Sequence, residues 1–433
     1  MNGKVKKPMK PATVLVLGFL TIIIAGCLLL SLPFSKRTGA EVSFLDCLFV
    51  SVSSVCVTGL TTVDIATSFT VFGRVVICLM IQLGGLGFAS FALFLLSLLG
   101  KKLSFSSMSL AKEAMNYDSG KGIVSLVRSV FRYASAIELA GTVLLFFPYY
   151  RATGSVLKAI GMGCFHSVST FNNAGFDLNG NFSSLAMFRG NVYVNVVFAL
   201  LILLGGLGFF VMKDIIRQKR WGRFSFHTKI VLSMTLVLVV GGTLLLAAGG
   251  TGLLDSFFLA VSARTAGFST VPLEGLSNSS TLVMVFLMFI GANPGSTGGG
   301  VKTTTIFVIF VAMGSMISGR KPTAFRKRIP QESITKALTV FVMMMVVILL
   351  AVFCISMVEG DSVSPTDVLF EVVSAAATVG LSRSLTPALH IASRIMIMIV
   401  MFTGRLGPLT VVTLFTREKT ERLEYIEENV LIG

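Results

Sequence analysis

Four short segments centred on glycine have the residue types and the spacing to bind a cation. They recur roughly a hundred residues apart. Glycine adopts backbone angles that are barred to other residues, so each segment can turn its carbonyl oxygens toward a common centre. Rings of backbone carbonyls replace the hydration shell of a cation in this way. We therefore predict cation ligands in four glycine loops: Val57, Thr58 and Gly59; Asn173, Ala174 and Gly175; Thr265, Ala266 and Gly267; and Thr378, Val379 and Gly380.

The residues before each glycine repeat as well. A phenylalanine stands ten residues before every one of the four glycines, and a serine follows it by four residues in three copies. The third copy has Val261 instead of serine. A spacing that is kept four times in one chain indicates four copies of one structural unit. The phenylalanines are Phe49, Phe165, Phe257 and Phe370, and the serines are Ser53, Ser169 and Ser374.

Membrane helices must carry these loops. The chain has 433 residues, of which 54% are hydrophobic and 13% are charged, whereas soluble domains have about 25% charged residues. Apolar runs long enough to span a bilayer recur along the whole sequence. The net charge of +16 does not indicate nucleic-acid binding, because the basic residues cluster in short segments between the apolar runs. The first run follows four lysines but lacks a cleavage site, so we interpret it as a retained span rather than a signal peptide.

Each unit repeats one order of elements: a membrane helix, a short apolar half-span, a glycine loop and a second membrane helix. The half-spans have about 12–14 residues, too few to cross a hydrocarbon core of ~30 Å, so we expect them to enter the membrane and turn back. The predicted half-spans are 44–57, 157–172, 254–265 and 366–378. The predicted membrane helices are 12–33, 70–99, 124–149, 190–214, 229–250, 280–318, 334–357 and 391–415.

The sequence therefore predicts an all-α polytopic membrane protein. Eight transmembrane helices and four re-entrant pore helices surround one central pore. The four tandem units comprise residues 1–102, 103–223, 224–328 and 329–433. Lys and Arg cluster on one side of the predicted spans, so we expect both termini to be cytoplasmic and the glycine loops to lie toward the outside. Residues 103–122 and the tail from 416 are expected on the cytoplasmic side.

Three half-spans begin near an aspartate, which we interpret as a helix N-cap. Asp46, Asp255 and Asp367 stand 12 or 13 residues before their glycines, and the second unit departs from this pattern with Ser155 and Lys158.

Glycine clusters also mark the second helix of each unit. Residues 84–88 and 205–209 share the sequence Gly-Gly-Leu-Gly-Phe, for which close helix packing is one explanation. Residues 291–300 combine Pro294 with several glycines, and a helix cannot run smoothly through such a stretch. A packing kink is an alternative explanation. A phosphate-binding loop is excluded, because Val301 stands where that motif requires lysine.

Together, the four loops, the interruption at 291–300 and the Gly404–Arg405 pair resemble the Trk/Ktr/HKT superfamily of potassium transporters. Within it the chain is most similar to KtrB-type membrane subunits of bacterial Ktr systems. One departure is Cys56, where the first loop of the family usually has threonine. The resemblance implies four M1–P–M2 units, as in potassium channels, in the bacterial plasma membrane.

The resemblance also implies partners and cofactors. We expect a homodimer among membrane lipids, gated by a cytoplasmic ring of RCK (KtrA-like) nucleotide-binding subunits. No cofactor is expected in the chain itself. Potassium is the cargo, Na⁺ is a candidate activator, and nucleotide acts only through the partner. No resident metal and no nucleic acid are expected.

The resemblance further implies a gate below the loops. Arg405 would lie beneath the loops and hold the gate segment, residues 291–301, although it is also a candidate partner for Glu138 or Glu371. Glu138 itself is interpreted as a tie between helices. The implied gate residues are Gly291, Asn293, Pro294, Gly295, Gly298, Gly299, Gly300, Lys302 and Arg405.

The expected function is potassium uptake through a filter of backbone carbonyls. The alternative is a cation symporter or a poorly selective potassium and sodium transporter. An intramembrane enzyme is excluded, because the sequence has no close carboxylate pair, no Ser/His or Cys/His set and no HExxH motif.

Overall fold

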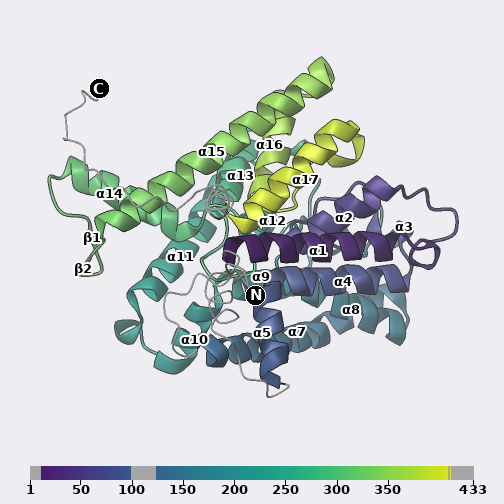
Figure 1. The fold of residues 1–433 in the computed structure, drawn as a ribbon, viewed down its shortest axis with the longest axis horizontal. Coiled ribbons are helices and arrows are strands. Elements are labelled where there is room, and N and C mark those ends of the chain that lie inside the picture. Colours follow the sequence, from purple (N-terminus) through teal and green to yellow (C-terminus); the bar gives the residue numbers. More distant parts are fainter. Residues whose placement is uncertain (1–10, 99–122, 408–409, 411–433) are drawn as a thin grey trace, which may run out of the picture.

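The computed structural model describes residues 11–98, 123–407 and 410. Within these ranges the chain is helical, apart from one hairpin of two-residue strands, β1 (Thr323–Ala324) and β2 (Lys327–Arg328). Figure 1 shows the helices packed directly on one another with no sheet between them. The predicted all-α class is therefore confirmed. The predicted surface segment 103–122 and the tail from 416 lie outside the described residues.

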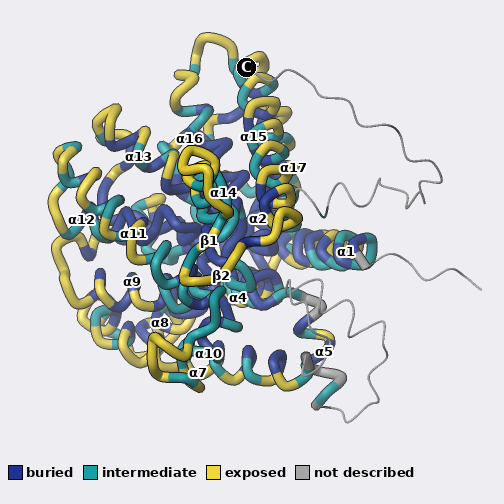
Figure 2. Tube along the Cα trace, turned by 90° about the vertical axis from the view of Figure 1, so that its left-hand side faces the viewer, coloured by how far each residue is buried: buried dark blue, intermediate teal, exposed yellow. Residues whose placement is uncertain are grey.

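Four long helices are apolar enough to cross a membrane. They are α1 (Pro11–Ser31), α7 (Ile123–Thr153), α11 (Phe226–Ala248) and α15 (Gln331–Glu359). Large apolar side chains on them are turned outward: Leu28 is 58% exposed and Leu349 is 59% exposed. Figure 2 shows such exposed turns around a buried centre. An outer surface of this kind suits lipid rather than water.

A short helix follows each long one. These helices are α2 (Phe44–Cys56), α8 (Val156–Phe171), α12 (Leu253–Ser262) and α16 (Pro365–Ala376). Each ends where a glycine loop begins, and the C-terminal half of each is buried. At the start of α2, Ser43 and Asp46 form a reciprocal capping box, and α16 begins with Pro365 after the capping residue Ser364.

The last helix is interrupted in the first three units, which corrects the prediction of continuous helices over 70–99 and 190–214. Gly87 and Gly208 have φ of 79° and 92°, and this left-handed conformation ends the helix before it. The axes of α9 and α10 differ by 99°. The pairs are α4 (Val71–Leu86) with α5 (Phe88–Leu98), α9 (Val192–Gly206) with α10 (Phe209–Gln218), and α13 (Asn278–Phe289) with α14 (Thr303–Ile317).

The fourth of these helices, α17 (Ile391–Leu406), ends at Gly407, whose φ is 84°. Residues 408–409 and 411–415 of the predicted helix 391–415 lie outside the described residues. Because of the interruptions, four helices in the described ranges pass as membrane spans by length and composition, or five if α9 and α10 count as one. The remaining short elements are α3 (Ile65–Ser68) and six 3-10 turns: Pro33–Ser35, Ala186–Phe188, Trp221–Arg223, Leu273–Gly275, Gly360–Ser362 and Thr386–Ala388.

Different glycines of each cluster have different roles. A Cβ atom on Gly84, Gly205 or Gly404 would overlap a backbone carbonyl oxygen at the C-terminal end of the short helix in the same unit. These three glycines therefore allow close packing. The later glycines, Gly87, Gly208 and Gly407, end the helices α4, α9 and α17. The carbonyls that lie against Gly84, Gly205 and Gly404 belong to Val55, Phe171 and Ala376.

The close approach at Gly205 predicts a cost for a single methyl group. Gly205→Ala should lower stability by about 1–3 kcal/mol, because the Cβ atom would overlap the carbonyl oxygen of Phe171. Gly241→Ala is the control, because Gly241 lies in α11 with no atom within 4 Å of its Cβ position. That change should stabilise the helix by about 0.5–1 kcal/mol. Thermal unfolding in detergent measures both, and equal midpoints would contradict the packing role.

Candidate functional site

The four glycine loops meet around one axis. Each glycine lies against the carbonyl oxygen of the residue before the glycine in the next loop. A Cβ atom on Gly59 would lie 2.5 Å from that oxygen, and one on Gly175 would lie 3.1 Å from it. The ring closes from the fourth loop to the first, so loops one and three lie opposite each other, as do two and four. The neighbouring pairs are Gly59 with Ala174, Gly175 with Ala266, Gly267 with Val379, and Gly380 with Thr58.

Each loop has the same unusual backbone. The glycine and the residue two positions before it both have positive φ, for example 58° at Val57 and 74° at Thr265. For a β-branched residue this conformation is an outlier that costs about 1–3 kcal/mol, and such strain persists only where the surroundings hold it. The equivalent residues Asn173 and Thr378 have φ of 56° and 53°.

Serine side chains hold the first and fourth loops. Ser53 Oγ accepts a hydrogen bond from the backbone N–H of Gly59 at 3.0 Å, and Ser374 Oγ accepts one from Gly380 at 3.1 Å. These bonds turn the loop amides toward the short helix and leave the carbonyls free on the other side. Within the described ranges, no hydrogen bond reaches the carbonyl oxygens of Thr58, Ala174, Ala266 and Val379.

The second and third loops use serine differently. Ser169 Oγ accepts from the backbone N–H of Phe176 at 3.0 Å and donates to its carbonyl oxygen at 2.7 Å. In the third unit the repeated position is Val261, and the next residue, Ser262, donates to the carbonyl oxygen of Phe268 at 2.5 Å. The serine that seemed to be missing from the repeat is therefore displaced by one residue.

The chain that leaves the first and third loops is tied back to its short helix. The carboxylate of Asp46 accepts a hydrogen bond from Thr62 Oγ1 at 2.6 Å, and that of Asp255 accepts one from Thr270 Oγ1 at 2.9 Å. Both threonines stand three residues after the glycine of their loop. The interpretation of these acids as N-caps is corrected: the N-cap residues are Ser43, Gly252 and Ser364, and only Asp46 takes part in capping, as the third residue of the capping box with Ser43. The carboxylates of Asp46 and Asp255 hold the chain that leaves the loop.

Ion pairs add to these ties. Asp46 also pairs with Arg394 at the start of α17, and Asp255 pairs with Arg189 just before α9, so each tie joins two units. In the fourth unit Asp367 pairs with Arg383, three residues after Gly380. The N···O distances are 3.4 Å for Arg394–Asp46, 3.3 Å for Arg189–Asp255 and 3.2 Å for Arg383–Asp367.

A cavity of about 510 Å³ lies on one side of the loops and is lined by the glycines of all four. Residues 181–184, which follow the second loop, also line it. The backbone N–H of Phe182 donates to Asp64 of the first unit at 3.0 Å, and Ser184 Oγ accepts from the N–H of Ser269 in the third unit at 3.0 Å. This segment therefore connects two opposite units beside the cavity.

The interruption between α13 and α14 packs against the inner ends of the short helices. Thr297 Oγ1 donates at 3.3 Å to the carbonyl oxygen of Phe171 and at 3.2 Å to that of Gly205. Asn293 Nδ2 donates to the carbonyl oxygen of Gly206 at 2.7 Å. Lys302 Nζ donates at 2.7 Å to the Gly298 carbonyl within the same segment. The buried polar groups of the segment are thus paired, as backbone at membrane depth requires.

Arg405 joins three units at this level. Its guanidinium donates to the carbonyl oxygen of Thr297 in the third unit and to those of Gly84 and Gly85 in the first. Glu138 and Glu371 are the candidate partners that the sequence offers, and Arg405 forms a hydrogen bond with neither of them. Backbone carbonyls at the helix break and in residues 291–301 satisfy the guanidinium instead.

Glu138 ties helices together, as the sequence analysis proposed. Its carboxylate accepts hydrogen bonds from Gln82 of α4 and from Asn172 Nδ2 at the start of the second loop, both at 3.1 Å. Asn172 also fits closely against Gly85, where a Cβ atom would collide with its side-chain oxygen.

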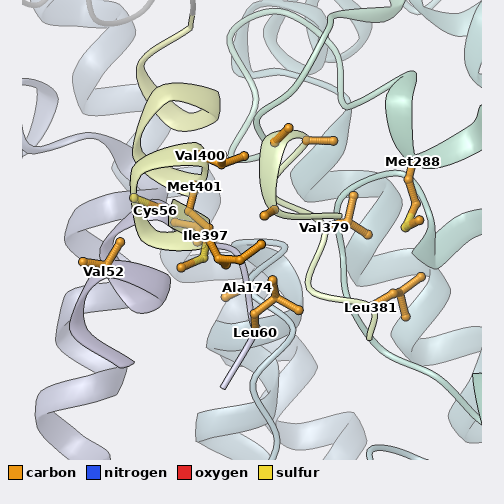
Figure 3. Close-up of a cluster of buried hydrophobic side chains, with 14 of the residues drawn as sticks. Val52, Cys56, Leu60, Ala174, Met288, Val379, Leu381, Ile397, Val400 and Met401 are labelled. Carbon is orange, nitrogen blue, oxygen red and sulfur yellow. The ribbon is translucent and has the colours of Figure 1, made fainter. Parts of the chain in front are cut away.

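Apolar packing surrounds the loops. Figure 3 shows Cys56 beside Ile397, Val400 and Met401 of α17, with Ala174 nearby. Cys56 is fully buried, so its side chain belongs to this apolar packing.

Comparison with known proteins places this arrangement in a family. The sequence profile of TrkH, described as a cation transport protein, matches residues 16–254 and 234–423. The chain belongs to the TrkH cation transport family. A TrkH-family protein with several apolar helices is a multi-pass membrane transporter.

Curated relatives cover nearly the whole chain. "Ktr system potassium uptake protein B" of Bacillus subtilis is 37% identical over 98% of this chain and 97% of its own length. "Potassium/sodium uptake protein NtpJ" of Enterococcus hirae is 35% identical over 100% of this chain and 99% of its own. The crystal structure of the potassium transporter TrkH from Vibrio parahaemolyticus matches with a TM-score of 0.73, at 18% identity, over 96% of this chain and 86% of that one.

The contacts of Arg405 in this TrkH-family chain predict a local effect. Arg405→Ala should raise amide hydrogen exchange in residues 291–301 by about tenfold, because charge-assisted bonds to the segment and to the helix break are lost. Arg394→Ala is the matched control, because Arg394 lies on the same helix but bonds to Asp46 and two carbonyls at its other end. Unchanged exchange at 291–301, or failure of Arg405→Ala to reach the membrane, would contradict a local holding role.

Proposed function

We propose that this chain takes up potassium through a pore at the axis of the four glycine loops. The observation that carries the proposal is the closed ring, in which each glycine lies against a carbonyl of the next loop that accepts no hydrogen bond in the described residues. Four such oxygens around one axis are suited to replace the water around a potassium ion. The names of two relatives, which describe potassium uptake, support the choice of ion.

The proposed architecture is four M1–P–M2 units. Each unit begins with a long helix and continues with a short pore helix. An interrupted helix ends each of the first three units, and α17 takes this place in the fourth. If both parts of every interrupted helix belong to one span, the fold has eight transmembrane helices and four pore helices. The proposed unit boundaries are after residues 102, 223 and 328.

The proposed selectivity filter consists of the three residues that end in the glycine of each loop. Carbonyl oxygens supply the ligands, and the strained backbone keeps them directed at the axis. Its residues are Val57, Thr58, Gly59, Asn173, Ala174, Gly175, Thr265, Ala266, Gly267, Thr378, Val379 and Gly380.

The proposed gate is the segment 291–301 on the inner side of the filter, with Lys302 and Arg405. A glycine-rich segment held by side-chain bonds from other units has few internal contacts that oppose its displacement. Arg405 would fix its closed position and place a positive charge on the cation path. The glycines, Asn293 and Pro294 of the segment allow its irregular course.

We further propose a homodimer in the bacterial plasma membrane, surrounded by lipid, with both termini cytoplasmic. A cytoplasmic RCK ring would regulate it, so nucleotide would act through that partner and the chain itself would hold no cofactor. The name of the B. subtilis relative, which assigns that protein to a Ktr system, supports a separate regulatory component. Na⁺ remains a candidate activator.

A second candidate function is less selective transport of potassium and sodium, or cation symport. The name of the E. hirae relative, which includes sodium, favours this alternative. Each loop has one glycine, which offers fewer fixed carbonyl sites than the two-glycine loops of potassium channels.

Ion flux into proteoliposomes separates these functions. Gly175→Ser should lower the ratio of potassium to sodium flux by about tenfold, because the new side chain lies 3.1 Å from the Ala266 carbonyl and strains a φ of 72°. Gly161→Ser is the matched control, because Gly161 lies on the same short helix with no atom within 4 Å of its Cβ position. Equal flux of both ions in both native and variant protein would contradict the filter. No flux, even with the RCK partner added, would contradict the proposed function.

The cavity beside the four glycines, which faces the outside in the proposed orientation, predicts that transport depends on external pH. Burial and the nearby Asp64 raise the pKa of Asp177, which lines the cavity, to about 7. Its carboxyl is therefore neutral below that pH and negative above it, beside Glu274, which lines the same cavity, and near Asp64. The KM for potassium should fall by about fivefold between external pH 6 and pH 8.

Two variants test this assignment. Asp177→Asn should remove the pH dependence of KM, whereas Thr61→Ala, which lines the same cavity without a titratable group, should keep it. An unchanged pH dependence in Asp177→Asn would show that another group is responsible.

A further inference from the structure

One position behind the glycine loops differs systematically between the units. The residue directly after the repeated phenylalanine lies on each short helix, nine residues before the glycine, and is buried in all four units. It is apolar in units one and three and polar in units two and four. These residues are Val50, His166, Phe258 and Glu371, with exposed fractions of 0%, 0%, 0% and 1%.

His166 holds the chain that leaves the second loop. Its Nε2 accepts a hydrogen bond from the backbone N–H of Leu178 at 3.2 Å, three residues after Gly175. Its Nδ1 lies 2.8 Å from the carbonyl oxygen of Met162, which can only accept, so Nδ1 carries the proton. The ring also stacks on Tyr149 at a centroid distance of 4.7 Å. These contacts fix one tautomer and one orientation of the ring.

Glu371 holds the chain that leaves the fourth loop in the same way. Its Oε1 accepts from Ser382 Oγ at 2.9 Å and from Thr386 Oγ1, and both hydroxyls belong to the chain that leaves the fourth loop. Its Oε2 is buried and has no partner among the described residues. A carboxyl held by one oxygen in an enclosed site is sensitive to any shift of the chain that supplies its donors.

Units one and three hold the chain that leaves the loop by side chains at another position of the short helix. Val50 and Phe258 offer no hydrogen bond, and the chain after loops one and three is held instead by Asp46 and Asp255 near the start of their short helices. In the fourth unit Asp367 near the helix start also pairs with Arg383, so the chain after that loop is held from both places. Because loops two and four are opposite each other, a polar side chain at mid-helix is present along one diagonal of the ring and absent along the other.

We propose that His166 and Glu371 are positioning residues that set the width of the filter along the diagonal between the second and fourth loops. They touch no ion. They hold the chain just beyond Gly175 and Gly380 and thereby the distance between the carbonyl oxygens of these two loops. This inference rests on the proposed filter. It assigns potassium preference over sodium to two side chains outside the filter.

The test measures potassium and sodium flux in proteoliposomes for the full chain. Glu371→Leu should lower the ratio of potassium to sodium flux by about tenfold, the effect of losing hydrogen bonds to a buried carboxyl. His166→Leu should act in the same direction. Glu371→Gln keeps an acceptor oxygen and should restore most of the native ratio. A role in stability alone would lower the yield of folded protein without changing the ratio.

Glu359→Leu is the matched control, because Glu359 accepts a backbone hydrogen bond from His390 at 2.9 Å in the same unit, away from the filter. Its flux ratio should equal that of the native chain. Ser382→Ala removes one donor to Glu371 with little change in packing and should shift the ratio by about threefold. If Glu371→Leu does not fold, Ser382→Ala still tests whether Glu371 sets the flux ratio.

The outcomes separate the two proposals. A native ratio in folded Glu371→Leu, or in Ser382→Ala, overturns the role of Glu371 while the filter stands. A native chain that conducts potassium and sodium equally overturns the filter and this inference together. A loss of ratio in Glu371→Leu that Glu371→Gln restores, with Glu359→Leu unchanged, supports the positioning role.

Discussion

The close approach of four backbone segments at one axis is the constraint on which the rest of the structure depends. Each glycine lies so near the carbonyl of the next loop that a Cβ atom would collide or press against it. Such proximity brings carbonyl dipoles together in an apolar surrounding, which is unfavourable unless a cation joins them. The short helices, their terminal serines and the positive φ values are the means by which the chain maintains this arrangement.

The supports around the ring are more varied than the ring itself. The loops share one backbone conformation, yet the side chains that hold them come from different positions. In the third unit Ser262 takes the place of the serine expected at 261. The chain beyond the loop is held by Asp46 or Asp255 from the start of the short helix, or by His166 or Glu371 from its middle. A backbone geometry can be kept while its supports change, because a hydrogen bond needs only an acceptor at the right distance.

This difference explains what the sequence could and could not predict. The loops and short helices were predictable, because glycine, phenylalanine and apolar length repeat in the primary sequence. The continuous helices over 70–99 and 190–214 were wrong, because an apolar run has the same composition whether or not Gly87 or Gly208 adopts a left-handed conformation. The partners of Arg405 were not predictable either, since backbone carbonyls leave no signal in the sequence, whereas Glu138 and Glu371 do.

The inner side of the ring shows why the interrupted helices matter. The carbonyl of Phe171 at the end of α8 has no helical partner, and Thr297, in the segment between α13 and α14, donates a hydrogen bond to it. Arg405 does the same for Gly84 and Gly85 at the first helix break. Displacement of the segment must therefore expose the carbonyl ends of helices, whose partial negative charge attracts cations. When the segment is in place, these hydrogen bonds cover the helix-end carbonyls. The same carbonyls would stabilise an ion once the segment has moved away.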